Sequence, residues 1–328
     1  MGERSYRVMA SHADEQPEPE GAPRTLAVGP HDAGRRLDVF LAEQLGLSRA
    51  QVRRLLGRGE VSVAGRPARE RDKGRALAPG ERVEVAPFRA AREQRITPEP
   101  DLPLTILAQG PGWLALDKPA GMAMHPFEEA ERGTLLAAVV ARHPEVHGVG
   151  EGGLRSGVVH RLDVDTSGVV LVATEEAVWQ RLRRAFREHR VEKVYRAVVA
   201  GRVEAPGAAD LGVCMARHRP ARVRVVPEAE GASARGVWRV RMSWRPLELR
   251  EDSSLLEVRP ETGFLHQIRV VLAHAGHPLL GDRTYASPEI AARAPHHLLH
   301  ATRVAFEEIL AKGDVPHPCF STATERQG

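Results

Sequence analysis

Hydrophobic residues in the first ninety positions recur first at helical spacing and then at strand spacing. Two sets lie three or four residues apart: Leu37, Phe40, Leu41 and Leu45, then Val52, Leu55 and Leu56. Such spacing places the apolar side chains on one face of each of two helices. The runs 61–65 and 82–85 alternate apolar and polar residues instead, as short strands do. We therefore predict a small α/β module at residues 31–88.

The pattern changes beyond residue 104, where strand-like runs dominate. Four such runs stand at 113–116, 168–172, 195–199 and 255–258. Between them, Val178, Leu182 and Phe186 mark the apolar side of an amphipathic helix. Many strands with few helices favour a mixed or antiparallel sheet over a parallel, doubly wound one. We predict an α+β domain at residues 104–320.

Two segments lack either pattern. Residues 1–30 are rich in Pro and Glu and are predicted to form a disordered tail. Residues 89–103 hold Pro98, Pro100 and Pro103 amid charges, which predicts a linker.

Composition narrows the class of protein. Of the 328 residues, 42% are hydrophobic and 27% charged, which indicates a globular chain. The two cysteines, Cys214 and Cys319, have neither disulfide-framework nor metal-site spacing. No run resembles a signal peptide or a membrane span, so we expect a cytoplasmic, monomeric protein that does not bind membranes.

Weak motifs for metals and nucleotides are set aside. The pairs His274/His277 and His297/His300 have zinc-like spacing, but no third ligand cluster accompanies them, so no metal is expected. Residues 148–153 fit GxGxxG without a strand before or a helix after, so they are expected to form a loop and no nucleotide cofactor is predicted.

Basic residues are concentrated in blocks although the net charge is only +4. Residues 31–95 hold 15 Lys/Arg against 9 Asp/Glu, and residues 181–196 hold 7 against 2. Such blocks can converge on a phosphate-binding face, but they can equally be scattered over a solvated surface. Charge alone leaves both alternatives open.

The densest polar cluster follows a pair of valines at 158 and 159 and ends at Gly168. It contains His160, Arg161 and Asp163, and then Asp165, Thr166 and Ser167. The last three residues suit a hydrogen-bonded turn. Asp163 is not explained by a turn and is the candidate for chemistry.

The motif HRLDxxTSG at residues 160–168 resembles the active-site motif of RluA-type pseudouridine synthases. Three further segments resemble family motifs in the family's order: 116–126, 192–197, and 263–270 followed by 276–282. Phe264-Leu265 departs from the family, which usually has a basic or small polar pair before His-Gln.

The resemblance implies a fold, an activity and site residues. The large domain would have the pseudouridine synthase fold, and Asp163 would be the catalytic carboxylate, with Arg269 as the cation that keeps it ionised. Tyr195 would stack on the target base, and Arg161 would fill the place of the flipped nucleotide. His160 would position the loop or the RNA. The reaction moves a ribose from nitrogen 1 to carbon 5 of uracil, so no cofactor is required, and Asp163 can act as nucleophile or as base.

The first module resembles the S-four-type RNA-binding domain. The matching segments are 36–38, 48–49, 59–65 and 79–83. The resemblance implies that the second helix presents arginines to RNA phosphates: Arg49, Arg53, Arg54 and Arg58. The alternative is a helical hairpin whose arginines are only solvated.

Together these features predict an RNA pseudouridine synthase, with large-subunit ribosomal RNA as the first candidate substrate and tRNA as the second. A non-catalytic RNA-binding or ribosome-assembly protein on the same fold is the rival from another class. A carboxylate-dependent nucleoside hydrolase is a further alternative, and it would release free uracil.

Overall fold

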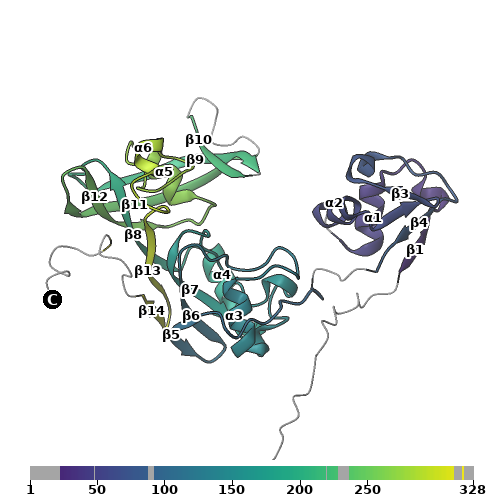
Figure 1. Cartoon of the computed structure of the whole chain (residues 1–328), viewed down its shortest axis with the longest axis horizontal. Helices are drawn as coiled ribbons and strands as arrows, with labels where there is room; N and C mark the ends of the chain where they lie inside the picture. The colour runs from purple at the N-terminus through teal and green to yellow at the C-terminus, as the bar shows by residue number, and fades with distance from the viewer. Residues whose placement is uncertain are drawn as a thin grey trace, which may run out of the picture. The chain divides into compact units, whose positions relative to one another are not determined.

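A computed structural model describes residues 23–47, 49–87, 92–218, 220–227, 236–313 and 320. The chain divides into two compact units, Met1–Gln94 and Arg95–Gly328. Figure 1 draws both, and each is described here by itself.

The first unit packs two helices on a small antiparallel sheet. The helices are α1 (Leu37–Leu45) and α2 (Arg49–Arg58), and two short 3-10 turns are Pro30–Asp32 and Glu70–Gly74. The described strands run in the order β1 (Arg24–Ala27), β4 (Arg82–Val85), β2 (Val61–Val63) and β3 (Arg66–Ala68). Phe40, Leu41 and Leu56 are among its buried core residues. The helices and strands predicted from the apolar spacing are confirmed.

The predicted tail is too long at its C-terminal end. Strand β1 pairs with β4 in the register Arg24↔Val85 to Ala27↔Arg82, so this part of the chain belongs to the sheet. Backbone pairing with β4, rather than a long apolar run, holds this edge strand in place. Residues 1–22 of the predicted tail, and Ser48 of the module, lie outside the described residues.

The second unit contains a ten-stranded sheet within the described residues. Its order is β10 (Ala221–Val226), β9 (Gly207–His218), β11 (Trp238–Leu249), β12 (Ser253–Pro260), β8 (Glu192–Ala200), β13 (Leu299–Phe306), β7 (Ser167–Ala173), β6 (Trp113–Lys118) and β5 (Thr105–Gly110), with β14 (Ile309–Lys312) paired to β13. Strands β13 and β7 run parallel, and the other described pairs of this sheet are antiparallel. The predicted α+β class with a mixed sheet is confirmed.

Apolar residues cover both faces of the sheet around β6 and β7. Along β7, Val170 and Val172 join one core cluster, whereas Val169 and Leu171 join another. Helices α3 (Leu135–Arg142) and α5 (Gln267–His274) contribute to the first cluster, and α4 (Glu176–Arg187) contributes to the second. The short helix α6 spans Pro288–Ala291. Burial on both faces explains why β7 is apolar throughout rather than alternating.

The predicted linker is too long as well. Ile96 is 2% exposed within the core of the second unit, and the Glu99 amide donates to the Ala137 carbonyl at 3.1 Å. The Arg142 guanidinium donates to the carbonyls of Pro100 and Leu102. Residues 95–103 are therefore irregular but packed against the second unit. The prolines mark a change of chain direction and not an unpacked linker. No helix of the described residues has the length and hydropathy needed to cross a membrane.

Candidate active site

A cleft of about 970 Å³ lies in the second unit where the loop before β7 faces α4, β8 and the loop before α5. Six Lys or Arg side chains are among the described residues that line it: Arg161, Arg183, Arg184, Arg187, Lys193 and Arg269. Asp163 is the one acidic residue in that lining set. The cleft is therefore strongly basic around a single carboxylate.

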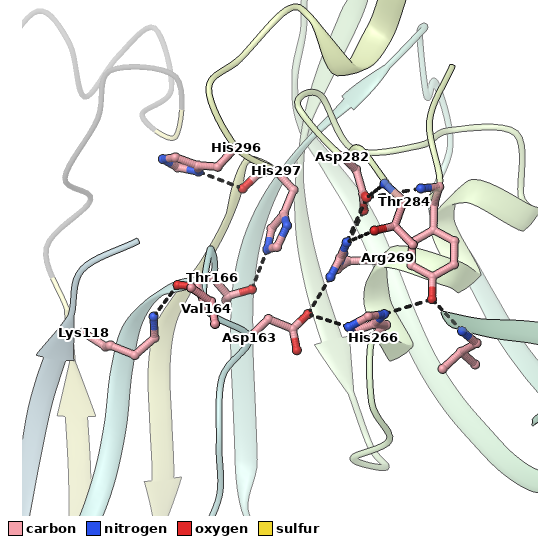
Figure 2. A network of polar contacts seen from close by, with 12 residues as sticks. Lys118, Asp163, Val164, Thr166, His266, Arg269, Asp282, Thr284, His296 and His297 are labelled. Carbon is pink, nitrogen blue, oxygen red and sulfur yellow. Dashed lines mark hydrogen bonds and ion pairs between the residues drawn. The ribbon is translucent and has the colours of Figure 1, made fainter. Parts of the chain in front are cut away.

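The turn that carries Asp163 is held by a buried lysine. The Thr166 amide donates to the Asp163 carbonyl at 3.1 Å, which closes the turn. Lys118 is fully buried, and its Nζ donates to the carbonyls of Pro119, Met122 and Val164 at 2.8 to 2.9 Å. Burial lowers the pKa of Lys118 to about 8, while three acceptors match the three protons of an ammonium group. Figure 2 shows how Lys118 reaches the backbone beside Asp163.

The other end of the turn rests on β13. Thr166 Oγ1 lies 2.8 Å from His297 Nε2, and Ser167 Oγ lies 2.8 Å from His300 Nδ1. Gly168 has φ +108°, and a Cβ there would collide with the backbone of Ala301. Glycine is thus required where the turn that carries Asp163 meets β13. The two histidines that have zinc-like spacing contact hydroxyl groups of the turn.

Arg269 connects Asp163 to a second, wholly buried carboxylate. Its Nη1 donates to Asp163 Oδ2 at 2.9 Å, and its Nε and Nη2 donate to the two oxygens of Asp282 at 2.8 and 2.9 Å. Burial alone would lower the pKa of Arg269, but hydrogen bonds and charges from Asp282 and Asp163 raise it above its usual value. Arg269 therefore stays charged between the two carboxylates, as Figure 2 shows.

Asp282 is itself oriented by backbone groups. It is 0% exposed, and its Oδ1 accepts the amides of Thr284 at 2.8 Å and Tyr285 at 3.2 Å. Although burial would raise the pKa of Asp282, the hydrogen bond from Arg269 outweighs it and holds the pKa below its usual value. Sequence reasoning assigned Asp282 no role. Its one local signal is an Asp whose carboxylate can bond the amide two residues later, as in an Asx turn.

His266 and Tyr285 form a further arm of this network. His266 adopts φ +55°, which is uncommon for a residue with a Cβ. Its Nε2 lies 3.9 Å from Asp163 Oδ2, and its Nδ1 lies 3.0 Å from the Tyr285 hydroxyl. That hydroxyl accepts the Val223 amide at 2.9 Å. Burial lowers the pKa of His266, which favours the neutral ring.

Tyr195 and Arg161 lie in the same cleft as Asp163, where the resemblance expects them. Tyr195 is 9% exposed, and burial together with the charge of Asp163 raises the pKa of its phenol far above the usual value. The phenol therefore stays protonated. Arg161 is exposed at the cleft.

His160 makes contacts with the protein. Its Nε2 accepts the Leu171 amide at 2.9 Å, and its ring stacks on Phe186 at 4.5 Å. Burial lowers the pKa of His160 to about 3, so the ring is neutral at physiological pH. Of its two expected roles, these contacts favour holding the loop over touching RNA.

The four arginines of α2 lie in the first unit and all are exposed: Arg49, Arg53, Arg54 and Arg58. Arg58 lies 3.7 Å from Glu60, a distance at which the pair is weak. Phe264 and Leu265, the departure from the family motif, line the cleft of the second unit.

The chain is similar to known proteins that share one description. Residues 112–274 match the family model described as RNA pseudouridylate synthase. An uncharacterized RNA pseudouridine synthase of Chloroflexus aurantiacus is 36% identical over 292 residues, covering 86% of this chain and 85% of that protein. Ribosomal large subunit pseudouridine synthase D of Xanthomonas campestris is 36% identical over 275 residues, covering 83% of this chain and 78% of that protein.

A solved structure shares the fold. Human RNA Pseudouridylate Synthase Domain Containing 1 superposes with a TM-score of 0.53 at 23% identity, covering 67% of this chain and 86% of that chain. Since two relatives above 30% identity span more than four-fifths of the chain, the motif resemblance is confirmed. The chain belongs to the RNA pseudouridine synthase family, whose members are isomerases.

Proposed function

We propose that this enzyme converts specific uridines of large-subunit ribosomal RNA to pseudouridine, with Asp163 as the catalytic carboxylate. The observation that carries the proposal is the contact of Asp163 with buried Arg269 in a cleft whose lining is otherwise basic. The choice of RNA is supported by relatives named ribosomal large subunit pseudouridine synthase D, which are 32% to 36% identical to this chain.

The reaction breaks the bond between the ribose anomeric carbon and nitrogen 1, and it forms a bond between that carbon and carbon 5. The proton on carbon 5 is lost and nitrogen 1 gains one, so the product is an isomer of the substrate. Asp163, which accepts a hydrogen bond from Arg269, attacks the anomeric carbon or removes the neighbouring sugar proton. Tyr195, protonated and apolar on its faces, stacks on the base.

A base inside a helix must leave its stack before it enters the cleft, at a cost of a few kcal/mol. Arg161 is exposed at the cleft and fills the vacated place with its planar guanidinium. His160 positions the loop that carries Arg161 through a contact within the protein, the hydrogen bond from the Leu171 amide.

The first unit contributes phosphate contacts through Arg49, Arg53, Arg54 and Arg58, as the S-four-type resemblance implies. Such contacts position an RNA without reading its sequence. A monomer in the cytoplasm remains the expected state. tRNA remains the second candidate substrate.

The test maps pseudouridines in ribosomal RNA and tRNA from cells with and without the gene, followed by reaction of the purified enzyme with the RNA that changes. Asp163→Asn, nearly the same in shape, should bind that RNA but release no tritium from carbon-5-labelled uridine. A variant with substantial turnover would refute the role of Asp163. Free uracil among the products would identify a hydrolase, and an unmodified RNA would favour a non-catalytic binding protein.

A further inference from the structure

Two aromatic side chains form a shelf in the cleft, and the proposed chemistry does not use them. Trp238 begins β11, and Phe264 lies in the loop between β12 and α5. Their ring centroids are 5.8 Å apart, with the planes tilted by 32°. Both residues line the same cleft as Asp163. We call this pair the aromatic shelf.

Packing does not account for the shelf. Trp238 is 59% exposed, whereas Trp113 is 8% exposed in the core. Trp179 donates its indole N–H to the Val158 carbonyl at 3.0 Å. Within the described residues, the Trp238 indole has no hydrogen-bond acceptor. Phe264, the other member of the shelf, is partly buried against the main core.

The surroundings of the shelf favour a nucleic acid. The lining of the cleft has six Lys or Arg side chains against one carboxylate. Arg184 and Arg187 on α4 form no ion pair with a described residue. Cations for phosphates beside an aromatic face for bases are the means by which proteins bind single-stranded nucleic acid.

We propose that the aromatic shelf stacks on an unpaired nucleobase next to the target uridine. This inference rests on the proposed function. Phe264 precedes His266 by two residues, a span of at most about 7 Å. His266 Nε2 is 3.9 Å from Asp163 Oδ2, and the shelf residues line the same cleft as both, so RNA that enters the cleft to reach Asp163 also meets the shelf. The enzyme thereby selects uridines in loops, where the adjacent base is free to stack.

The experiment pairs protein variants with abasic RNA. Binding of the full chain is measured on oligonucleotides that span the mapped uridine, each with one base removed at a different flanking position. Trp238→Ala should raise Kd about 5- to 150-fold, as expected for the loss of a stack worth about 1–3 kcal/mol. Removal of the base at one position should raise the Kd of the wild-type protein by a similar factor. The same removal should not raise the Kd of Trp238→Ala any further. Trp238→Phe should restore most of the affinity.

Phe127→Ala provides the matched control, because Phe127 is 73% exposed and lies outside the cleft lining. The shelf would be refuted if Trp238→Ala binds RNA as tightly as Phe127→Ala. It would also be refuted if the weakening of binding by Trp238→Ala adds to the weakening by base removal at every flanking position. Binding to single-stranded oligouridine separates this inference from the proposed substrate. If Trp238→Ala binds oligouridine more weakly than wild type, the shelf is supported even if ribosomal RNA proves not to be modified. If the two proteins bind oligouridine equally, the shelf is overturned.

Discussion

Replacing Arg269 by Met tests the network around Asp163, the proposed catalytic carboxylate. Methionine keeps much of the side-chain volume but removes the charge between Asp163 and Asp282. Asp282 is 0% exposed and takes two of the guanidinium hydrogen bonds, so the variant buries an unpaired carboxylate. Breaking a buried ion pair in this way costs about 3–5 kcal/mol. For a unit of this size, that lowers the melting temperature by about 6–20 °C.

A second change separates stability from chemistry. In Arg269→Met/Asp282→Asn, no unpaired buried charge remains at 282, so most of the lost stability should return. Activity should be absent from both variants, because in each of them Asp163 lacks its cation. The assays are thermal unfolding by circular dichroism and tritium release from labelled RNA. An Arg269→Met protein as stable as wild type, or a double variant that regains activity, would refute this account of the network.

Three other perturbations test separate parts of the structure. Burial holds the folded pKa of His160 at about 3, so the stability it contributes is complete above its unfolded value of about 6.5 and is lost as the pH falls. Between pH 7 and 5 that loss is about 2 kcal/mol, and urea unfolding of His160→Asn should show a shallower pH dependence than wild type. Lys118→Met should leave buried carbonyls unpaired and cost about 1–3 kcal/mol. It should also lower kcat more than KM, because the turn that carries Asp163 shifts. Equal kcat values would show that the lysine does not position the turn. Arg54→Ala should reduce the slope of log affinity against log salt by about 0.7–0.9, as for one lost phosphate contact. The exposed control Arg66→Ala, off α2, should leave that slope unchanged, and equal slopes for both variants would argue against phosphate contacts by α2.

Periodicity predicted the elements that bury a regular face. The helix marked by Val178, Leu182 and Phe186 is α4, and each strand-like run became a strand. It failed where few side chains carry the signal. Strand β1 has four residues and little burial, and Ile96 is a single apolar residue amid polar ones. Such short segments are held by backbone pairing or one buried contact, which a pattern search does not register.

In the candidate site, too, some contacts were predicted and others were missed. Asp163 and Arg269 are 106 residues apart, so their pairing followed from resemblance and not from spacing. The buried partner of Arg269 was missed, because an aspartate in a loop does not indicate which distant cation it faces. The contacts of His297 and His300 with hydroxyls were missed for the same reason, since they join residues 131 and 133 positions apart.

The close contact between Gly168 and the Ala301 backbone affects when the enzyme first becomes active. Chains emerge from the ribosome N-terminus first, and contacts between distant residues form late. Asp163 is synthesised well before β13, the strand that closes against its turn, and Arg269 and Asp282 also come after it. A nascent chain that exposes the HRLD segment thus lacks the partners that orient it. We expect catalytic competence to arise only after β13 has been synthesised and can pair with β7, so a nascent chain without that strand is inactive.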